Sequence, residues 1–165
     1  FDLALQSGFA RDSILKTGNW LGPLIVAAAQ QGVQKLLLFG YHGKLIKLAG
    51  GIFHTHNHLA DARLEILTSI AVSEDTPLSM IRAITNAQSM EAALTSLCAI
   101  DPLLVERVWS RVAYEVEKRS ILYLSRYLST SMEIGSVLFD RQRKLRWAGP
   151  CGQKYLAFYK LGLQE

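Results

Sequence analysis

All four histidines of this 165-residue chain fall within seventeen residues, at His42, His54, His56 and His58. Imidazole titrates near neutral pH and both donates and accepts hydrogen bonds, so the cluster suits proton transfer, polar recognition or metal binding. On a helix His54 and His58 share a face, whereas in an extended chain the last three all point one way. Histidine metal sites usually add carboxylates or thiolates, and only Asp61 is close in sequence. We therefore expect hydrogen-bonding and proton-transfer roles without a protein-bound metal.

A plainer interpretation gives these residues structural roles. One or two of the histidines could cap a helix or pack around Asn57. Asp61 and Arg63 would then form a local polar pair on the next helix, or a fork that recognises a carboxylate if Arg63 faces a ligand crevice. Residue types alone leave these alternatives open and fix no reaction class.

The turn Gly40-Tyr-His-Gly43 directly follows an apolar run at residues 35–39. In open parallel sheets the ligand crevice lies outside the carboxyl ends of the strands, where helix N-termini direct amides at the ligand. The two glycines allow close backbone approach, and Lys44 follows at an expected helix start. Gly40, His42, Gly43 and Lys44 therefore suit a carboxylate or phosphate. The spacing is neither the dinucleotide fingerprint nor a P-loop, and a turn without any ligand explains these residues equally well.

Several elements must position these groups. Residues 13–17 form a short extended candidate, Asn19 is a good helix N-cap, and Gly32 suits the end of the helix that follows. The run at residues 35–39 is typical of a strand covered on both faces. Strand, helix and strand in this order predict an α/β fold, with a small parallel sheet, flanking helices and a βαβ crossover. Residues 59–72 are expected to form the next helix.

A helical insert separates the early strands from the last one. Thr76-Pro77 and Asp101-Pro102 each place a capping side chain before a proline suited to the first helical position, and residues 89–99 form another short helix. The final extended segments are residues 134–139 and, after a polar turn, residues 144–147. These two segments suit a hairpin at the sheet edge.

Composition predicts a folded chain, because half of the residues are hydrophobic and 19% are charged. The longest charge-free stretch, residues 17–34, has an apolar core much too short to span a bilayer, so no membrane association is expected. Cys98 and Cys151 lack the spacing of a disulfide framework, which favours free thiols in the cytoplasm. We expect a single α/β domain over residues 1–165. The absence of an initiator methionine suggests a cut chain.

One long string of residues carries a family resemblance. The sequence GKLIKLAGGIFHTHNHLADARLEIL, from Gly43, resembles the hallmark of the CbiD family. KTGNWLGPLIVAA and IGSVLFDRQRKL resemble the segments before and after it in the same order. The resemblance covers most of the chain, although residues 75–105 resemble the family only in their general helical character and not residue by residue. Asn57 stands where the family has serine, and His58 adds an imidazole that the family pattern does not require.

The resemblance implies that the intact protein transfers a methyl group from S-adenosylmethionine to ring carbon 1 of cobalt-precorrin-5B, in anaerobic cobalamin biosynthesis. Family members are about twice this length, so an N-terminal domain of the same protein is an expected partner, and this piece alone is expected to be inactive. The cobalt belongs to the corrinoid substrate. On this basis Gly40, His42, Gly43 and Lys44 would bind the cofactor, His54 and His56 would be catalytic, and Asp61 and Arg63 would face substrate carboxylates.

Two other functions are compatible with the residues. A metal-dependent hydrolase could use His54, His56 and His58 as ligands. A non-catalytic module could bind anions or nucleic acid through the basic turn from Arg141 to Arg146. The family resemblance favours the methyltransferase, with no nucleic acid among its partners.

Overall fold

A three-stranded sheet lies at the centre of the fold in the spatial order β1-β2-β3. The computed structural model describes residues 1–163. β1 (Lys35–Tyr41) pairs in parallel with β2 (Glu133–Phe139), and β2 pairs antiparallel with β3 (Leu145–Ala148). The predicted α/β class and the closing hairpin are therefore confirmed. The crossover between the parallel strands contains the helical insert.

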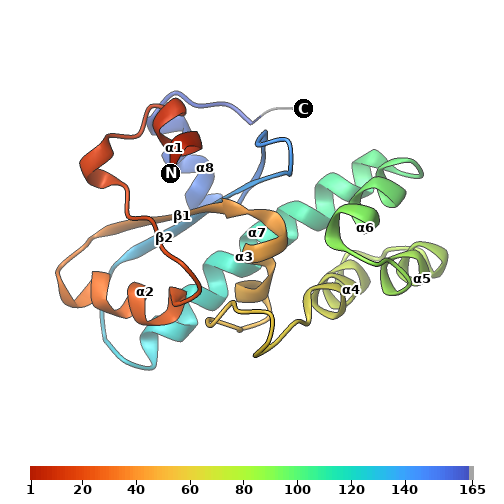
Figure 1. Cartoon of the computed structure of the whole chain (residues 1–165), viewed down its shortest axis with the longest axis horizontal. Coiled ribbons are helices and arrows are strands. Elements are labelled where there is room, and N and C mark those ends of the chain that lie inside the picture. Colours follow the sequence, from red (N-terminus) through yellow and green to blue (C-terminus); the bar gives the residue numbers. More distant parts are fainter. Residues whose placement is uncertain (164–165) are drawn as a thin grey trace.

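Helices cover both faces of this sheet (Figure 1). On one face lie α7 (Pro102–Ser125), α3 (His42–Ala49) and α2 (Leu21–Gln30). On the other face lie α8 (Pro150–Phe158) and the short α1 (Asp2–Gln6). The core is continuous between the sheet and α7, and its fully buried side chains include Ile25, Ile46, Leu48, Trp109, Ile134 and Leu138.

The helical insert forms one end of the molecule (Figure 1). It consists of α4 (Arg63–Ser73), α5 (Leu78–Thr85) and α6 (Met90–Cys98), and all three lie before α7 in the chain. The predicted cap at Asp101 is present, because its carboxylate accepts the Leu104 N–H at 3.0 Å. At the start of α6 the Ser89 hydroxyl, which was not predicted as a cap, accepts the Ala92 N–H at 3.1 Å. None of the described helices is long and apolar enough to cross a membrane.

The structure corrects three expectations about individual elements. Residues 13–17 do not form a strand, because a short 3-10 helix, η1 (Arg11–Ser13), leads into an irregular segment. The apolar run at residues 35–39 is only partly buried, since β1 is an edge strand whose side chains pack against clusters on both faces but of which only Leu38 is buried. The central strand β2 is the one with a continuous buried run. The helix expected over residues 59–72 begins only at Arg63.

Two further corrections concern helix starts, whereas the prediction of free thiols is confirmed. The residue that precedes α2 is Trp20, so Asn19 is not its N-cap. Pro77 itself occupies the cap position of α5 and not the first helical position. Cys98 and Cys151 are free, and burial raises the pKa of both thiols.

A buried carboxylate fastens α8 to the sheet. Glu117 on α7 accepts the backbone N–H groups of Ser136, Cys151 and Gly152 at 2.9, 3.0 and 2.8 Å. Cys151 and Gly152 belong to the first turn of α8, so an internal anion satisfies that helix N-terminus. Burial raises the pKa of Glu117, and the three hydrogen bonds oppose this effect.

We predict that Glu117→Ala lowers the free energy of unfolding by about 3 kcal/mol or more, because three buried N–H donors lose their acceptor. Urea denaturation measures this change. Glu106→Ala on the same helix is the control. The Glu106 carboxylate is half-exposed and pairs with Arg146 at 3.3 Å, so its loss should cost less than about 1 kcal/mol. Equal losses at the two positions would contradict the role of Glu117.

Candidate functional site

The buried ammonium group of Lys47 shapes the loop that carries the histidines. α3 directs this side chain inward, and the residue is 1% exposed. Its Nζ donates to the Thr55 carbonyl at 3.1 Å, the Asn57 Oδ1 at 2.7 Å and the Ala60 carbonyl at 2.7 Å. An ammonium group has three N–H donors, so all of them are used. Burial lowers the Lys47 pKa, while the nearby Asp61 carboxylate opposes that shift.

A second set of contacts ties this loop to the segment before α2. The Thr55 N–H donates to the Asn19 carbonyl at 2.9 Å, and the Thr55 hydroxyl donates to the Asn19 Oδ1 at 3.1 Å. Lys44 Nζ donates to the Gly18 carbonyl at 2.8 Å. The ring of His54 packs edge-on against Trp20, with 4.7 Å between centroids. The loop is therefore fixed from two sides.

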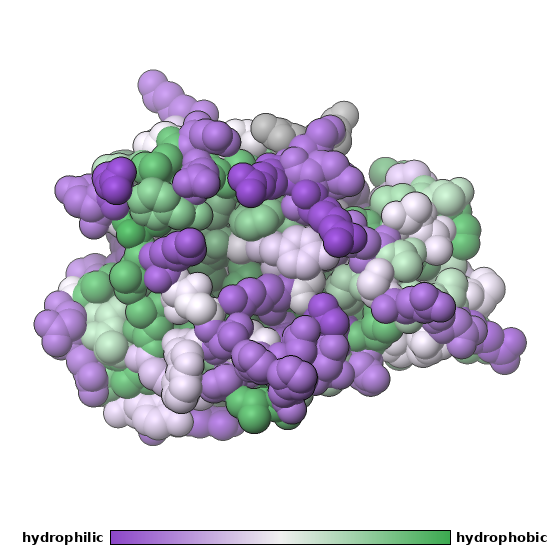
Figure 2. Space-filling model, in the orientation of Figure 1, coloured by the Kyte–Doolittle hydropathy of each residue, from purple (hydrophilic) through white to green (hydrophobic). Residues whose placement is uncertain are grey.

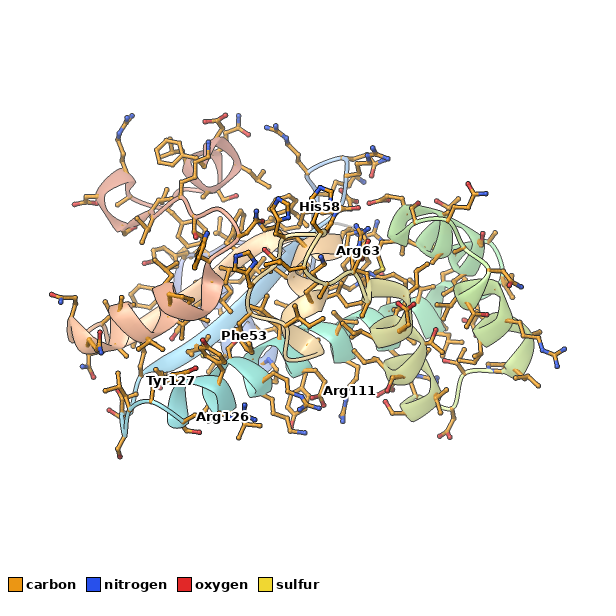
Figure 3. All side chains as sticks on the ribbon, turned by 60° about the horizontal axis from the view of Figure 1, so that its bottom comes forward. Phe53, His58, Arg63, Arg111, Arg126 and Tyr127 are labelled. Carbon is orange, nitrogen blue, oxygen red and sulfur yellow. The ribbon has the colours of Figure 1, made fainter. Side chains whose placement is uncertain are left out.

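An open groove of about 400 Å³ lies between these segments, beside the start of α3. Three of its lining side chains are cationic, and none of the described lining residues is acidic. Figure 2 shows hydrophilic residues gathered over the loop between α3 and α4. In Figure 3, His58 and Arg63 lie toward one side of the molecule, whereas Phe53, at the start of the loop, lies toward the end of α7. The lining residues are Asn19, Tyr41, Gly43, Lys44, Lys47, Thr55, His56, Asn57, His58 and Arg63.

Four of the eight residues predicted for the site line this groove: Gly43, Lys44, His56 and Arg63. The other four, Gly40, His42, His54 and Asp61, are close by but are not among the lining residues. Lys47, Tyr41 and His58 also contribute to the wall. The groove thus joins the turn after β1 to the histidine loop, as the positions of these segments in the sequence suggested.

Close packing within the chain explains both glycines of the turn. A Cβ atom at Gly40 would lie 2.9 Å from Leu45 Cγ, and one at Gly43 would lie 2.6 Å from Tyr41 Cε1. The Tyr41 ring lies against the first turn of α3 where a side chain at position 43 would stand. Gly43 therefore allows this ring to form part of the groove wall.

The three loop histidines have different environments. The rings of His56 and His58 stack with 5.1 Å between centroids, and the His58 N–H donates to His56 Nδ1 at 3.4 Å. Both side chains are exposed. His54 instead packs on Trp20, and its buried Nδ1 has no hydrogen-bond partner among residues 1–163. Within the same residues, no three His, Cys, Asp or Glu side chains are grouped so that they could hold a metal.

Asp61 and Arg63 form a bidentate pair with two N–O distances of 2.6 Å. The hydrogen bonds from Arg63 lower the pKa of Asp61, and the same contact raises the pKa of Arg63. The predicted local pair is therefore present, and Arg63 is also one of the residues that line the groove. Asp61 orients the guanidinium, and the remaining N–H groups of Arg63 stay available.

Sequence reasoning missed a hydrogen-bonded chain that runs from α7 to the groove. The Trp109 Nε1–H donates to His42 Nδ1 at 3.1 Å. His42 Nε2 lies 2.9 Å from Glu91 Oε1, and the Tyr41 hydroxyl donates to the same oxygen at 2.8 Å. His42 is fully buried, and burial lowers its pKa while Glu91 opposes that shift. Trp109 is one of several apolar residues at helical spacing in α7, and no motif marks Glu91.

The basic turn after β2 is partly neutralised within the chain. Arg146 pairs with Asp140 at 3.5 Å and with Glu106 at 3.3 Å, and its guanidinium lies over the Trp147 ring. The Lys144 N–H donates to Asp140 Oδ1 at 2.9 Å. These bonds stabilise the hairpin turn itself.

Comparison with known proteins adds independent findings. Residues 54–150 match the family described as CbiD, C-terminal domain. The chain is 63% identical over 156 residues to a cobalt-precorrin-5B C(1)-methyltransferase of Prochlorococcus marinus strain MIT 9313, which covers 94% of this chain and 41% of the relative. It is 54% identical over 155 residues to a protein of the same name from Synechococcus strain CC9902, with coverages of 93% and 42%. The chain thus spans about two fifths of these relatives. No solved structure matches it significantly.

We predict that Lys47→Met loosens the histidine loop, because three acceptors lose a charged donor. Charged hydrogen bonds of this kind contribute about 1.5–3 kcal/mol, so the free energy of unfolding should fall by about that amount. Amide hydrogen exchange at residues 55–60 should accelerate, while exchange in β2 stays slow. Lys35→Met removes an exposed lysine and should change neither measurement. Unchanged exchange in the loop of the Lys47 variant would refute this role.

A pH dependence follows from His42. Its pKa in the folded protein lies below the unfolded value of about 6.5, so the unfolded chain takes up a proton first as the pH falls. The contribution of His42 to the free energy of unfolding is fully present above about pH 6.5. Below that pH it decreases, by at most about 1.4 kcal/mol per pH unit. His42→Gln should lose this slope in urea titrations, whereas His56→Gln should keep it. Parallel stability profiles for all three proteins would contradict the prediction.

Proposed function

This chain belongs to the CbiD C-terminal domain family, and on that premise we propose that it is the C-terminal domain of an enzyme that methylates ring carbon 1 of cobalt-precorrin-5B. The names of its relatives supply the substrate and the class of reaction. The observation in this chain that carries the site assignment is the groove lined by Lys44, Lys47 and Arg63 with no acidic side chain among the described lining residues.

The cationic groove fits the carboxylate side chains at the edge of a corrinoid. Lys44 uses one N–H on the Gly18 carbonyl, which leaves two donors for a ligand. Arg63 keeps three of its five N–H donors after the bidentate bond to Asp61. Lys47 has no donor left and contributes only its charge. We assign Arg63, oriented by Asp61, to a substrate carboxylate.

The start of α3 fits the carboxylate of S-adenosylmethionine. Gly43 and Lys44 line the groove there, and Tyr41 provides no side-chain cap for the first amides of the helix. Partial positive charge at these amides adds to the charge of Lys44. His42 would contribute through its backbone, because its imidazole is committed to the core, and Gly40 shapes the turn. The bound cofactor supplies an electrophilic methyl group.

Methyl transfer is an in-line displacement, so the main task of this chain is to position two ligands. His56 is exposed at the groove and is free to accept or deliver a proton at its Nε2. His54 stands beside it in the loop with a buried Nδ1 that has no partner in the described part of the chain. We assign proton handling to these two histidines. The cobalt stays with the substrate.

The remainder of the full-length protein is the partner in this proposal. Because the chain covers 41% of the relative from strain MIT 9313, we propose that the N-terminal part supplies the opposite wall of the open groove and that this piece is inactive alone. We also propose a cytoplasmic enzyme, where S-adenosylmethionine is made, without a nucleic-acid partner. The internal ion pairs of Arg146 support the latter point.

The experiment compares two corrinoids that differ in charge. In the full-length enzyme, Arg63→Gln should weaken binding of cobyrinic acid about tenfold, the value of one charge-assisted hydrogen bond. Binding of the fully amidated corrinoid should be weak and insensitive to this change. Lys35→Met, at the opposite end of β1, is the charge-matched control. Equal affinity for the acid and amide forms would sink the assignment.

Single-turnover methyl transfer tests the histidines in the same enzyme. His54→Ala and His56→Ala should each slow the reaction about 100-fold, a typical contribution of a group that handles a proton. His58→Ala is the control, because His58 stacks on His56 without an assigned role. Unchanged rates in both test variants would remove His54 and His56 from the site.

A further inference from the structure

Tyr41 lines the groove, and its hydroxyl has no role in the assignments above. We propose that its oxygen contacts the cationic centre of the methyl donor, and that Trp109, His42 and Glu91 form a chain of positioning residues that holds it there. This inference rests on the proposed function and deepens it. It names the residue that would distinguish a positively charged donor from its neutral product.

The chemistry of the indole group fixes the direction of every bond in the chain. Indole N–H can only donate, so His42 Nδ1, 3.1 Å from Trp109 Nε1, must be the unprotonated nitrogen. Neutral His42 then carries its proton on Nε2 and donates it to Glu91 Oε1 at 2.9 Å. Adding a second proton to His42 would cost the bond from Trp109. The core therefore selects one tautomer.

Glu91 receives two hydrogen bonds on a single carboxylate oxygen, from His42 and from the Tyr41 hydroxyl at 2.8 Å. The phenol is a donor toward Glu91, so its oxygen lone pairs remain for a ligand. Burial raises the pKa of Tyr41 to about 12, and the bond to Glu91 adds to this effect. Tyr41 therefore stays a phenol across the physiological range and presents an acceptor.

The two side-chain amide oxygens of the groove are already engaged. Asn57 Oδ1 accepts from Lys47, and Asn19 Oδ1 accepts from Thr55. In a groove lined by three cations, an acceptor backed by the Glu91 carboxylate is the complement of a positive ligand group. S-adenosylmethionine has two such groups, the sulfonium and the amino-acid ammonium. Gly43 leaves room for the Tyr41 ring against the first turn of α3, since a Cβ atom at position 43 would lie 2.6 Å from Tyr41 Cε1.

The geometry also gives the helical insert a link to the site. Glu91 lies in the first turn of α6, whereas Tyr41 ends β1 and Trp109 lies on α7. The three elements meet at His42, whose ring is also 5.6 Å from that of Trp147. Trp147 is equally buried, but its Nε1 has no partner among residues 1–163. It is therefore a matched control for Trp109.

The direct test measures binding of S-adenosylmethionine and S-adenosylhomocysteine to the full-length enzyme by calorimetry. The two ligands share the ammonium group, and only the first carries the sulfonium charge. Tyr41→Phe should weaken S-adenosylmethionine binding about tenfold. An unchanged affinity for S-adenosylhomocysteine identifies the sulfonium as the contact, and an equal loss identifies the ammonium. Unchanged affinity for both ligands would overturn the inference.

The positioning chain has its own readout in the nitrogen NMR shifts of His42. Wild-type enzyme should show the Nε2–H tautomer, and Trp109→Phe should lose this preference and weaken S-adenosylmethionine binding about threefold. If Trp109→Phe does not fold, Glu91→Gln is the replacement variant, and it should also weaken S-adenosylmethionine binding. Trp147→Phe should leave the tautomer and the affinity unchanged. Equal effects of the two tryptophan variants would reduce the chain to core packing and overturn the positioning role.

Failure of the proposed function gives a different result. If wild-type enzyme binds neither nucleoside, the methyltransferase assignment fails and the Tyr41 contact fails with it. If wild-type enzyme binds and methylates while Tyr41→Phe is indistinguishable from it, only the present inference fails.

Discussion

The site depends on the hydrogen bonds that the buried ammonium group of Lys47 donates to the histidine loop. A lysine that is 1% exposed has lost its water, and such a charge is tolerated only when its donors are fully satisfied. The chain provides that satisfaction from the Thr55 and Ala60 carbonyls and the Asn57 side chain. Burying one cation therefore dictates the path of the whole histidine loop. That loop in turn places His56, His58 and Arg63 beside the start of α3.

The same fold treats two helix N-termini in opposite ways. At α8 the internal carboxylate of Glu117 accepts the first-turn amides, so the start of that helix is satisfied within the chain. At α3 no side chain caps the helix, and Gly43 and Lys44 of its first turn line the groove. An open helix start beside three cations is an electrostatic environment for anions. The contrast separates a helix start with a structural role from one that suits a ligand.

His42 illustrates how a polar residue can serve a site from inside the core. Its two nitrogens connect Trp109 with Glu91, so elements that are distant in the chain meet at one imidazole. In a low-dielectric interior such bonds are strong only when each donor finds its acceptor, and both nitrogens of His42 satisfy this condition. The insert is thereby coupled to the turn after β1 through hydrogen bonds as well as packing.

The sequence by itself determined the features that depend on neighbours along the chain. Helical periodicity, the Asp101 cap and the closing hairpin all follow from local spacing, and they predicted the order of elements and the end of the sheet where Lys44, His56 and Arg63 meet. Only the tertiary structure determined the features that depend on partners far apart in the chain. Lys47 binds the Ala60 carbonyl, which the helix expected over residues 59–72 would have used, and α4 starts at Arg63. His42 and Glu91 are 49 positions apart, and His42 and Trp109 are 67 apart. No local sequence pattern predicts these contacts, because they form only when folding brings buried polar groups together as hydrogen-bond partners.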